Sequence, residues 1–172
     1  YLAGTFARDK DAVVASMLIC EMAAYYRNRG MSLYEGLQEI FRKYGYFIEG
    51  ITSFTLEGKE GIEKIGAAMD ALRGMKSYDL DCCEIIAVRD YLTQRRTDLA
   101  DGSSRALDLP VSNVLYYELK DRAWFCIRPS GTEPKIKIYY GVAEKSMEEA
   151  QLRLDRIKAG VTGMIRKLLG LD

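Results

Sequence analysis

Apolar residues crowd one stretch near the start of the chain. The segment AVVASMLICEMAAYYRNRG, residues 12–30, is apolar on almost every side and predicts a helix of the kind that is normally buried. Asp9 or Asp11 can cap the start of this helix, and Gly30 is well placed to end it. Because the chain has 172 residues, we expect part of this helix to lack the cover that its apolar surface needs.

A second helix is expected directly after the first. In SLYEGLQEIFRKYG, Ser32 and Glu35 form a capping box, and apolar residues follow at helical spacing: Leu33, Leu37, Ile40 and Phe41. From Tyr46 the sequence changes to YFIEGITSFTLEG, whose aromatic and β-branched residues predict a strand. We therefore place a domain boundary near Gly45, with residues 1–45 on one side and residues 46–172 on the other.

The remaining sequence mixes helical and strand-like patterns. A helix is predicted in KEGIEKIGAAMDALRG, with four apolar residues on one face: Ile62, Ile65, Met69 and Leu72. A long amphipathic helix is predicted over residues 146–169, packed on a sheet. Strands are predicted in CCEIIAVRDYLTQ, SNVLYYEL, AWFCIR and KIKIYY, and DLADGSSRALDLP is expected to form loop or short extended pieces. This order predicts an α+β fold.

Two strand-like segments flank the loop PSGTEP. The two-residue period of a strand divides AWFCIR into Trp124, Cys126 and Arg128 on one face, and Phe125 and Ile127 on the other. The same period separates three residues of KIKIYY from the other three: Lys135, Lys137 and Tyr139 against Ile136, Ile138 and Tyr140. We predict a hairpin with one apolar face, and a loop that Pro129 and Pro134 stiffen.

The residues of this loop suit an anion. Ser130 and Thr132 supply hydroxyls, and Gly131 permits successive backbone N–H groups to turn toward one point. Arg128 adds a planar fork of donors that matches two oxygens of a phosphate. Glu133 would repel a phosphate unless it turns away, toward one of the lysines that follow. From the residues alone, an ordinary surface hairpin loop remains an equal alternative.

Composition excludes several classes of site. The chain contains no histidine, which excludes a Ser-His-Asp triad, an imidazole general base and a histidine-containing metal site. Its formal net charge is zero, so no strong field attracts nucleic acid or an acidic membrane surface. The most apolar run, AVVASMLIC, is far shorter than the ~20 residues of a membrane span. We expect no nucleic-acid partner and no membrane insertion.

The four cysteines have no C-x-x-C spacing. Cys82 and Cys83 are neighbours, and in a strand their side chains would point to opposite faces. We therefore expect reduced thiols and a cytoplasmic protein. The chain begins at Tyr1 and not at methionine, which leads us to expect that it is part of a longer protein.

The motif RPSGTEPKIKIYY closely resembles the phosphate-binding loop in the last domain of the α-D-phosphohexomutases, the family of phosphoglucomutases and phosphomannomutases. The resemblance extends over essentially the whole chain, most closely with the phosphoglucomutase-like branch. YLAGTFARDKDAVVASMLICEMAAYYRNRG resembles the end of the family's third, sugar-binding domain, and LPVSNVLYYEL resembles the strand before the loop hairpin. The resemblance implies an antiparallel sheet packed by helices, similar to the TATA-box-binding protein, after a helical remnant of the third domain.

The resemblance also implies a function and a site. The family interconverts hexose 1-phosphates and hexose 6-phosphates through a phosphoserine, Mg²⁺ and glucose 1,6-bisphosphate, and its first three domains hold the serine, the metal ligands and the sugar-reading residues. For this chain it implies a grip on the non-reacting phosphate of a phosphosugar by four loop residues, Arg128, Ser130, Gly131 and Thr132, and by Lys10. The remaining domains of the parent enzyme are the implied partners, and the fragment alone is expected to be inactive.

Some residues near the motif are expected to have structural roles. Lys135 and Lys137 would supply structure or long-range positive potential, Trp124 and Tyr139 would lie in the core, and Lys10 has the alternative of a solvated charge at a helix start. A phosphate-binding module without catalysis remains the alternative function. An RNA-binding sheet is disfavoured by the neutral charge, and the absence of G-x-x-x-x-G-K-[ST] excludes a P-loop.

Overall fold

A computed structural model of the chain describes residues 3–5, 7–75, 77–78 and 80–171. The chain divides into two compact units between Gly45 and Tyr46, where the sequence pattern changes, and each unit is described by itself. The identity of these units as parts of two domains of a larger enzyme stays a prediction. No helix in the described residues is long and apolar enough to cross a membrane.

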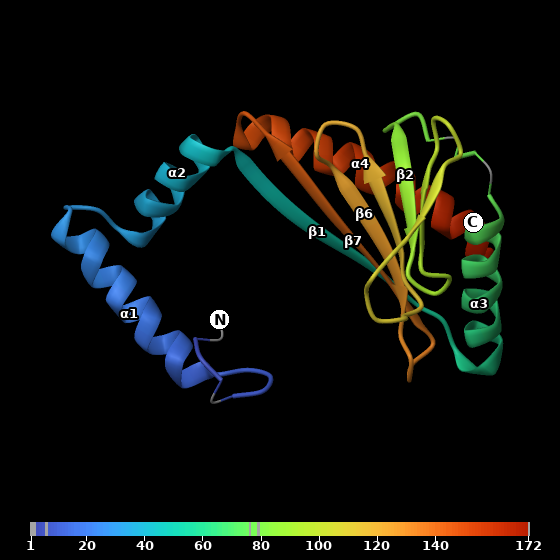
Figure 1. The fold of residues 1–172 in the computed structure, drawn as a ribbon, viewed down its shortest axis with the longest axis horizontal. Coiled ribbons are helices and arrows are strands. Elements are labelled where there is room, and N and C mark those ends of the chain that lie inside the picture. The colour runs from blue at the N-terminus through green and yellow to red at the C-terminus, as the bar shows by residue number, and fades with distance from the viewer. Residues whose placement is uncertain (1–2, 6, 76, 79, 172) are drawn as a thin grey trace. The chain divides into compact units, whose positions relative to one another are not determined.

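The first unit contains two capped helices (Figure 1). Helix α1 (Ala12–Asn28) begins after Asp11, whose side chain accepts a hydrogen bond from the Val14 amide at 3.0 Å. Helix α2 (Leu33–Tyr44) begins with the predicted capping box, in which Ser32 Oγ accepts from the Glu35 amide and the Glu35 carboxylate accepts from the Ser32 amide. Both helices are therefore confirmed, and Asp11 rather than Asp9 is the cap of the first.

Apolar side chains of these two helices are largely exposed within the unit. Helix α1 has no buried residue, and α2 buries only Gly36, which lies under the ring of Tyr26. Val13 and Met17 are 72% and 66% exposed. The expectation that α1 lacks part of its cover is confirmed for the described residues of this unit.

The second unit is built on a seven-stranded, wholly antiparallel sheet in the order β1-β7-β6-β5-β2-β3-β4 (Figure 1). Its strands are β1 (Tyr46–Thr55), β2 (Ile85–Asp90), β3 (Arg95–Asp98), β4 (Ser104–Ala106), β5 (Leu115–Leu119), β6 (Trp124–Pro129) and β7 (Lys135–Glu144). The tight turn between β5 and β6 places Asp121 and Arg122 at φ near +60° (58° and 61°), as a two-residue hairpin turn requires. Strand β3 lies in a polar segment that the apolar pattern did not single out.

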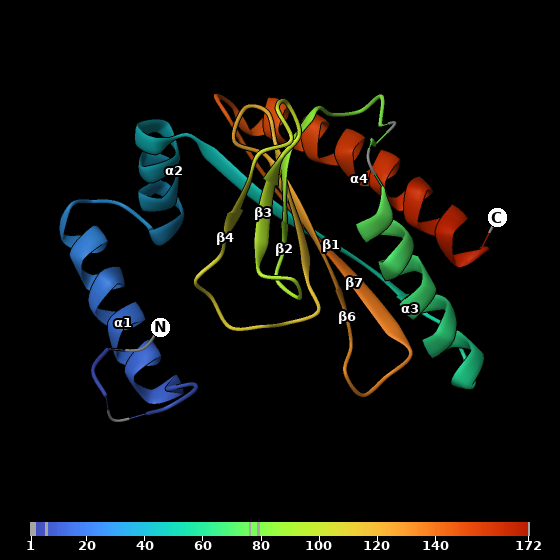
Figure 2. The ribbon, with the colours of Figure 1, turned by 45° about the vertical axis from the view of Figure 1, so that its right-hand side comes forward.

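Two helices cover one face of this sheet. Figure 2 shows α3 (Gly58–Gly74) and α4 (Met147–Leu169) on the same side, and the described residues of the unit place no helix on the other side. The predicted α+β fold, with helices packed on an antiparallel sheet, is confirmed. The core lies between the helices and the sheet, and its members that are fully buried include Met69, Leu72, Phe125, Ile127, Ile136, Ile138, Tyr140, Ile157 and Ile165.

The prediction for Ile62 was wrong. Ile65, Met69 and Leu72 of α3 are buried as expected, but Ile62 is 56% exposed. Ile62 directly follows Gly61, which is buried against Leu56, so the covered part of α3 reaches this turn. Ile62 itself lies beside the buried stripe and borders the hairpin loop. The buried stripe is centred on Gly61, Ile65, Ala68 and Leu72, and Ile62 lies at the margin of that stripe, where apolar character alone does not decide burial.

The prediction that Trp124 and Tyr139 lie in the core was also wrong. Both are only partly buried, because they lie on the sheet face that no helix of this unit covers. The Trp124 ring lies against Gly141 of β7, where a Cβ would overlap the indole, and it stacks on Tyr116 with ring centroids 5.3 Å apart. Neighbouring side chains of the open face thus bury these rings in part, and the helices do not.

A charged cluster occupies the same open face. Glu118 of β5 accepts hydrogen bonds from the guanidinium groups of Arg89 and Arg96, the latter through two bonds of 2.8 Å. These two cations lower the pKa of the Glu118 carboxyl to about 2. The cluster links side chains of the three adjacent strands β5, β2 and β3 and so stabilises their pairing.

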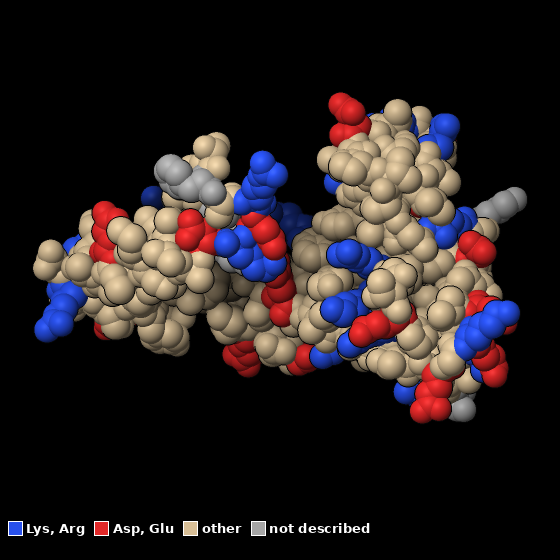
Figure 3. Space-filling model, turned by 90° about the horizontal axis from the view of Figure 1, so that it is seen from below, with Lys and Arg blue, Asp and Glu red and all other residues tan. Residues whose placement is uncertain are grey.

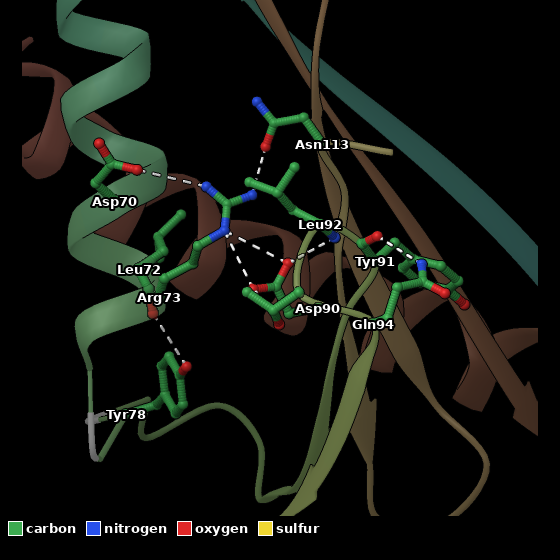
Figure 4. A network of polar contacts seen from close by, with 10 residues as sticks. Asp70, Leu72, Arg73, Tyr78, Asp90, Tyr91, Leu92, Gln94 and Asn113 are labelled. Carbon is green, nitrogen blue, oxygen red and sulfur yellow. Dashed lines mark hydrogen bonds and ion pairs between the residues drawn. The ribbon is translucent and has the colours of Figure 1, made fainter. Parts of the chain in front are cut away.

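A second polar network joins α3 to the sheet (Figure 4). Arg73 pairs with Asp90 at the end of β2 at 3.3 Å, with Asp70 of its own helix at 3.5 Å, and with the Asn113 side chain. Asp90 also accepts hydrogen bonds from the Leu92 amide and the Thr93 hydroxyl, at 3.0 and 2.9 Å. The helix, the β2–β3 turn and the segment before β5 are therefore held by one arginine.

The prediction for Cys82 and Cys83 was wrong as well. Strand β2 begins only at Ile85, and the two cysteines lie in a turn closed by a hydrogen bond from the Cys83 amide to the Leu80 carbonyl at 3.2 Å. In this turn the two Sγ atoms are 3.6 Å apart instead of pointing to opposite faces. All four cysteines are free thiols.

Candidate functional site

The predicted hairpin forms between β6 and β7. Its register pairs Trp124 with Gly141 at one end and Pro129 with Ile136 at the other, which leaves residues 130–134 as the loop. The predicted apolar face is confirmed, because four residues are fully buried beneath the helices: Phe125, Ile127, Ile136 and Ile138. Figure 2 shows the loop projecting beyond the ends of the two strands.

Hydrogen bonds inside the loop fix its shape. The Ser130 amide donates to the Lys135 carbonyl and the Lys135 amide donates to the Glu133 carbonyl, both at 2.7 Å. The Pro134 carbonyl accepts from the Leu56 amide at 2.8 Å, which ties the loop to the end of β1. The Thr132 and Glu133 amides lie 3.4 and 3.3 Å from Ser130 Oγ. Two successive backbone donors thus converge on one oxygen, as they do in anion-binding turns.

Three cations stand at the base of this loop. Arg128 and Lys137 are directly opposite each other in the β6–β7 register, and Lys135 lies two residues before Lys137 on the same open face. None of the three makes an ion pair or side-chain hydrogen bond within the residues that the structure describes. The ion pair expected between Glu133 and Lys135 or Lys137 is likewise absent among them. Like charges across a strand pair repel, so an anion placed between them is stabilised.

Gly131 lies at the exposed tip of the loop. Its φ is not in the left-handed region, and a Cβ added to it would meet no atom within 4 Å. Neither backbone strain nor packing in this chain therefore requires a glycine. What the missing side chain does provide is open space beside the loop amides.

A small cavity lies behind the loop, between it and α3. It has a volume of about 150 Å³, and residues of both elements line it, among them Ile62, Ile65, Ser130 and Glu133. Asn113 also lines it, held there by Arg73. The arginine is a donor only, so Asn113 presents its carbonyl oxygen to Arg73 and keeps its amide N–H₂ for other partners. Sequence reasoning missed Asn113, because only the fold brings this loop residue beside Ser130.

The structure brings four of the five predicted site residues together. Arg128, Ser130, Gly131 and Thr132 belong to one hairpin, with Arg128 exposed on the open face. Lys10 lies in the other unit, just before the α1 cap, where its ammonium is 3.0 Å from the carboxylate of Asp9. Its contact with a substrate stays a prediction.

Surface charge is mixed and not of one sign. In the face shown in Figure 3, basic and acidic side chains alternate over the larger unit, and uncharged residues cover most of the smaller one. The described residues contain no group of three or more Cys, Asp or Glu side chains placed to hold a metal ion. The resemblance implies Mg²⁺ ligands in domains outside this chain, and no role of the residues described here depends on a metal.

Comparisons with known proteins identify the family of this chain. Residues 57–159 match the family described as the phosphoglucomutase/phosphomannomutase C-terminal domain. Curated relatives include a phosphoglucomutase of Staphylococcus haemolyticus, 37% identical over 149 residues, and one of Staphylococcus epidermidis, 35% identical over 143 residues. The alignments cover 87% and 83% of this chain but only 27% and 26% of those proteins. The chain thus spans about a quarter of their length.

A solved structure has the same fold. The crystal structure of pp63/parafusin, a phosphoglucomutase from Paramecium in its open form, aligns with a TM-score of 0.59 at 17% sequence identity. The alignment covers 96% of this chain and 29% of that protein. Together with the family match over residues 57–159, these likenesses mean that the chain belongs to the phosphoglucomutase/phosphomannomutase family and carries its C-terminal domain.

Proposed function

We propose that this chain is the C-terminal part of a phosphohexomutase, and that its β6–β7 loop binds the non-reacting phosphate group of a phosphosugar substrate. The observation that carries the proposal is the arrangement at the base of the loop. Arg128 and Lys137 face each other without an internal carboxylate partner in the described residues, beside a turn whose amides already converge on one oxygen. Such a group of donors recognises a tetrahedral dianion.

Each loop residue has a distinct part in this grip. The Arg128 guanidinium offers two parallel N–H donors to two phosphate oxygens. The Thr132 hydroxyl and the loop amides supply further donors. Ser130 Oγ now accepts from the Thr132 and Glu133 amides; when phosphate binds, it either releases these amides to the phosphate or keeps them oriented toward the phosphate. Gly131 keeps the approach open. Glu133, which lines the cavity behind the loop, stays clear of the anion.

This recognition suits a reaction in which the substrate reverses. A hexose 1-phosphate becomes a bisphosphate and then a hexose 6-phosphate, so the gripped phosphate is attached to a different carbon in each half of the reaction. A site that reads only phosphate accepts both orientations, and residues elsewhere must distinguish the sugar. By holding one end of the substrate, the site places the other end for phosphoryl transfer and helps to exclude water.

Other parts of the enzyme lie outside this chain in the proposal. The phosphoserine, the ligands of Mg²⁺ and the sugar-reading residues are assigned to the remaining domains, with glucose 1,6-bisphosphate as the intermediate and activator. The first unit, residues 1–45, is assigned to the end of the sugar-binding domain, with Lys10 as a further phosphate contact, and the chain alone is proposed to bind without turnover.

The test uses the complete protein that the gene of this chain encodes. We expect it to convert glucose 1-phosphate to glucose 6-phosphate in a coupled assay with Mg²⁺ and the bisphosphate. Absence of activity on every hexose phosphate would contradict the mutase assignment. If in addition the reading frame begins near Tyr1 and the chain still binds phosphosugars, the function is that of a phosphate-binding module without catalysis.

A further inference from the structure

The turn before β2 brings two cysteine side chains into contact. Cys82 and Cys83 are both free thiols, and their Sγ atoms are 3.6 Å apart. The chain itself keeps the pair together, because the residues are adjacent and the turn is closed by the hydrogen bond from the Cys83 amide to the Leu80 carbonyl. Cys20 and Cys126 have no such neighbour among the described residues.

Helix α4 fixes the position of one of these sulfurs. Cys82 Sγ lies directly against Gly160, at the place that a Cβ of residue 160 would occupy. The next glycine of the helix, Gly163, has no such neighbour, since a Cβ there would meet nothing within 4 Å. Gly160 therefore leaves room for the thiol of Cys82. Gly163 is a matched control position on the same helix, because a Cβ added there would contact no side chain.

Both thiols are accessible to small molecules. They are half-buried and line a cavity of about 600 Å³ together with charged side chains of both signs, among them the paired Arg153 and Glu144. Cys82 also lines a second cavity of about 540 Å³, together with Leu80 and Gly160. A structural cysteine is normally enclosed and inert, whereas both of these cysteines are only partly buried and line a cavity.

We propose that Cys82 and Cys83 form a vicinal dithiol that closes reversibly to a disulfide on reaction with a low-molecular-weight disulfide, R–S–S–R. The Cys82 thiolate attacks one sulfur of R–S–S–R, which forms a mixed disulfide and releases one thiolate. Cys83 then loses its proton to solvent and attacks Cys82 Sγ, which releases the second thiol. Two electrons pass from the protein to the reagent, and two molecules of R–SH are formed.

The environment assigns the order of these steps. Burial and the neighbouring Cys82 raise the pKa of the Cys83 thiol to about 12, so Cys83 is the poorer first nucleophile. The product should also be easy to reduce. Adjacent Cα atoms are ~3.8 Å apart, below the usual ~4.4–6.8 Å of disulfides, so the small ring is strained and its disulfide belongs to the labile class.

The experiment uses the full chain with Cys20→Ser and Cys126→Ser, which leaves only the pair. The chain is incubated with glutathione disulfide, alkylated in denaturant and digested. The mass of the peptide that contains residues 82–83 is then measured by mass spectrometry. We expect a peptide lighter by two hydrogens that carries neither glutathione nor alkyl group, and its return to the dithiol form with dithiothreitol. With Cys83→Ser added, we expect a glutathione adduct that persists on Cys82.

A second pair of variants tests the geometry without removing a thiol. Gly160→Ala displaces Cys82 Sγ, and we expect closure to slow by roughly tenfold or more, as misplaced reacting groups do. Gly163→Ala makes the same change in helix propensity three residues later and should leave the rate unchanged. Circular dichroism checks that each variant keeps the fold.

Three results would overturn the proposal. They are two unreacted thiols, two separate glutathione adducts on the pair, or disulfides that link two chains. Equal closure rates in the two glycine variants would show that the folded turn does not set the geometry, which would equally contradict it.

Discussion

The two faces of the sheet in the second unit are built by the same strands, but they differ in burial and in charge. The covered face contributes fully buried apolar residues such as Ile127 and Ile138 to the core. The open face carries Arg128, Lys137 and the Glu118 cluster, which belong to the same strands or their neighbours. One face supplies stability and the other presents charge. The effect of a substitution should therefore depend on which face its residue occupies.

The largest effect is expected from adjacent residues of β7. Ile138→Ala removes a fully buried side chain and should lower the free energy of unfolding by about 2–5 kcal/mol. Lys137→Ala, one residue away on the open face, should change it by less than about 0.5 kcal/mol. Urea unfolding of both variants measures the difference, and similar losses would contradict the division between the faces.

The next effect concerns binding and not stability. Arg128→Ala should weaken the affinity for glucose 1-phosphate by about 1.5–3 kcal/mol, the range for hydrogen bonds to a charged group, and leave the melting temperature unchanged. Arg105→Ala is the matched control, because Arg105 is also exposed on this sheet but lies on β4, away from the loop. Calorimetric titration measures both. Equal affinities for the Arg128 and Arg105 variants would show that the Arg128 guanidinium does not bind the phosphate.

A smaller effect on stability should appear in acid. The folded pKa of Glu118, about 2, lies below the ~4.3 of an unfolded glutamate, so its contribution is present above pH ~4.3 and is lost as the pH falls toward 2. Glu118→Gln should cost about 1–2 kcal/mol at pH 7 and progressively less below pH ~4. Glu63→Gln, at an exposed ion pair of α3, serves as the control. A deficit that does not shrink with acid would contradict the assigned role.

The smallest expected change in stability is at the loop tip. Gly131→Ala should alter the free energy of unfolding by less than about 0.5 kcal/mol, because its backbone is ordinary and its Cβ meets no atom within 4 Å. It should nevertheless weaken phosphosugar binding, since the new methyl group occupies the approach to the amides. Gly141→Ala shows the opposite pattern in this account, a loss of stability, because its Cβ overlaps the Trp124 ring. Stability and binding assays on both variants separate the two roles.

Sequence patterns predicted those features that follow from a local period or cap. The Ser32–Glu35 capping box, the helix α4 and the two faces of the hairpin all depend on residues close in sequence. The polar strand β3 was missed because its pairing with β2, and not an apolar alternation, makes it a strand. Trp124 and Tyr139 were misplaced because their aromatic character was taken to favour burial, although the two-residue period had already placed them on the faces of Arg128 and Lys137.

The sequence named the residues of the candidate site, but it did not give their arrangement in space. The residue types of the loop already indicated an anion, and the family motif named the same residues. That Arg128 faces Lys137 depends on the strand register, and that Asn113 reaches the back of the loop depends on Arg73 of a distant helix. The contact between Cys82 and Cys83 depends on a turn that replaced the expected strand. Local patterns do not contain these relationships.

The most direct measurement of the central claim is an amide NMR titration of this chain with glucose 1-phosphate, glucose 6-phosphate, inorganic phosphate and glucose. We expect the three phosphate compounds to shift the same amides, those of Arg128 and of residues 130–133, and glucose to shift none of them. Shifts that follow the sugar, or phosphate-dependent shifts confined to other parts of the chain, would contradict a site that reads phosphate through this loop.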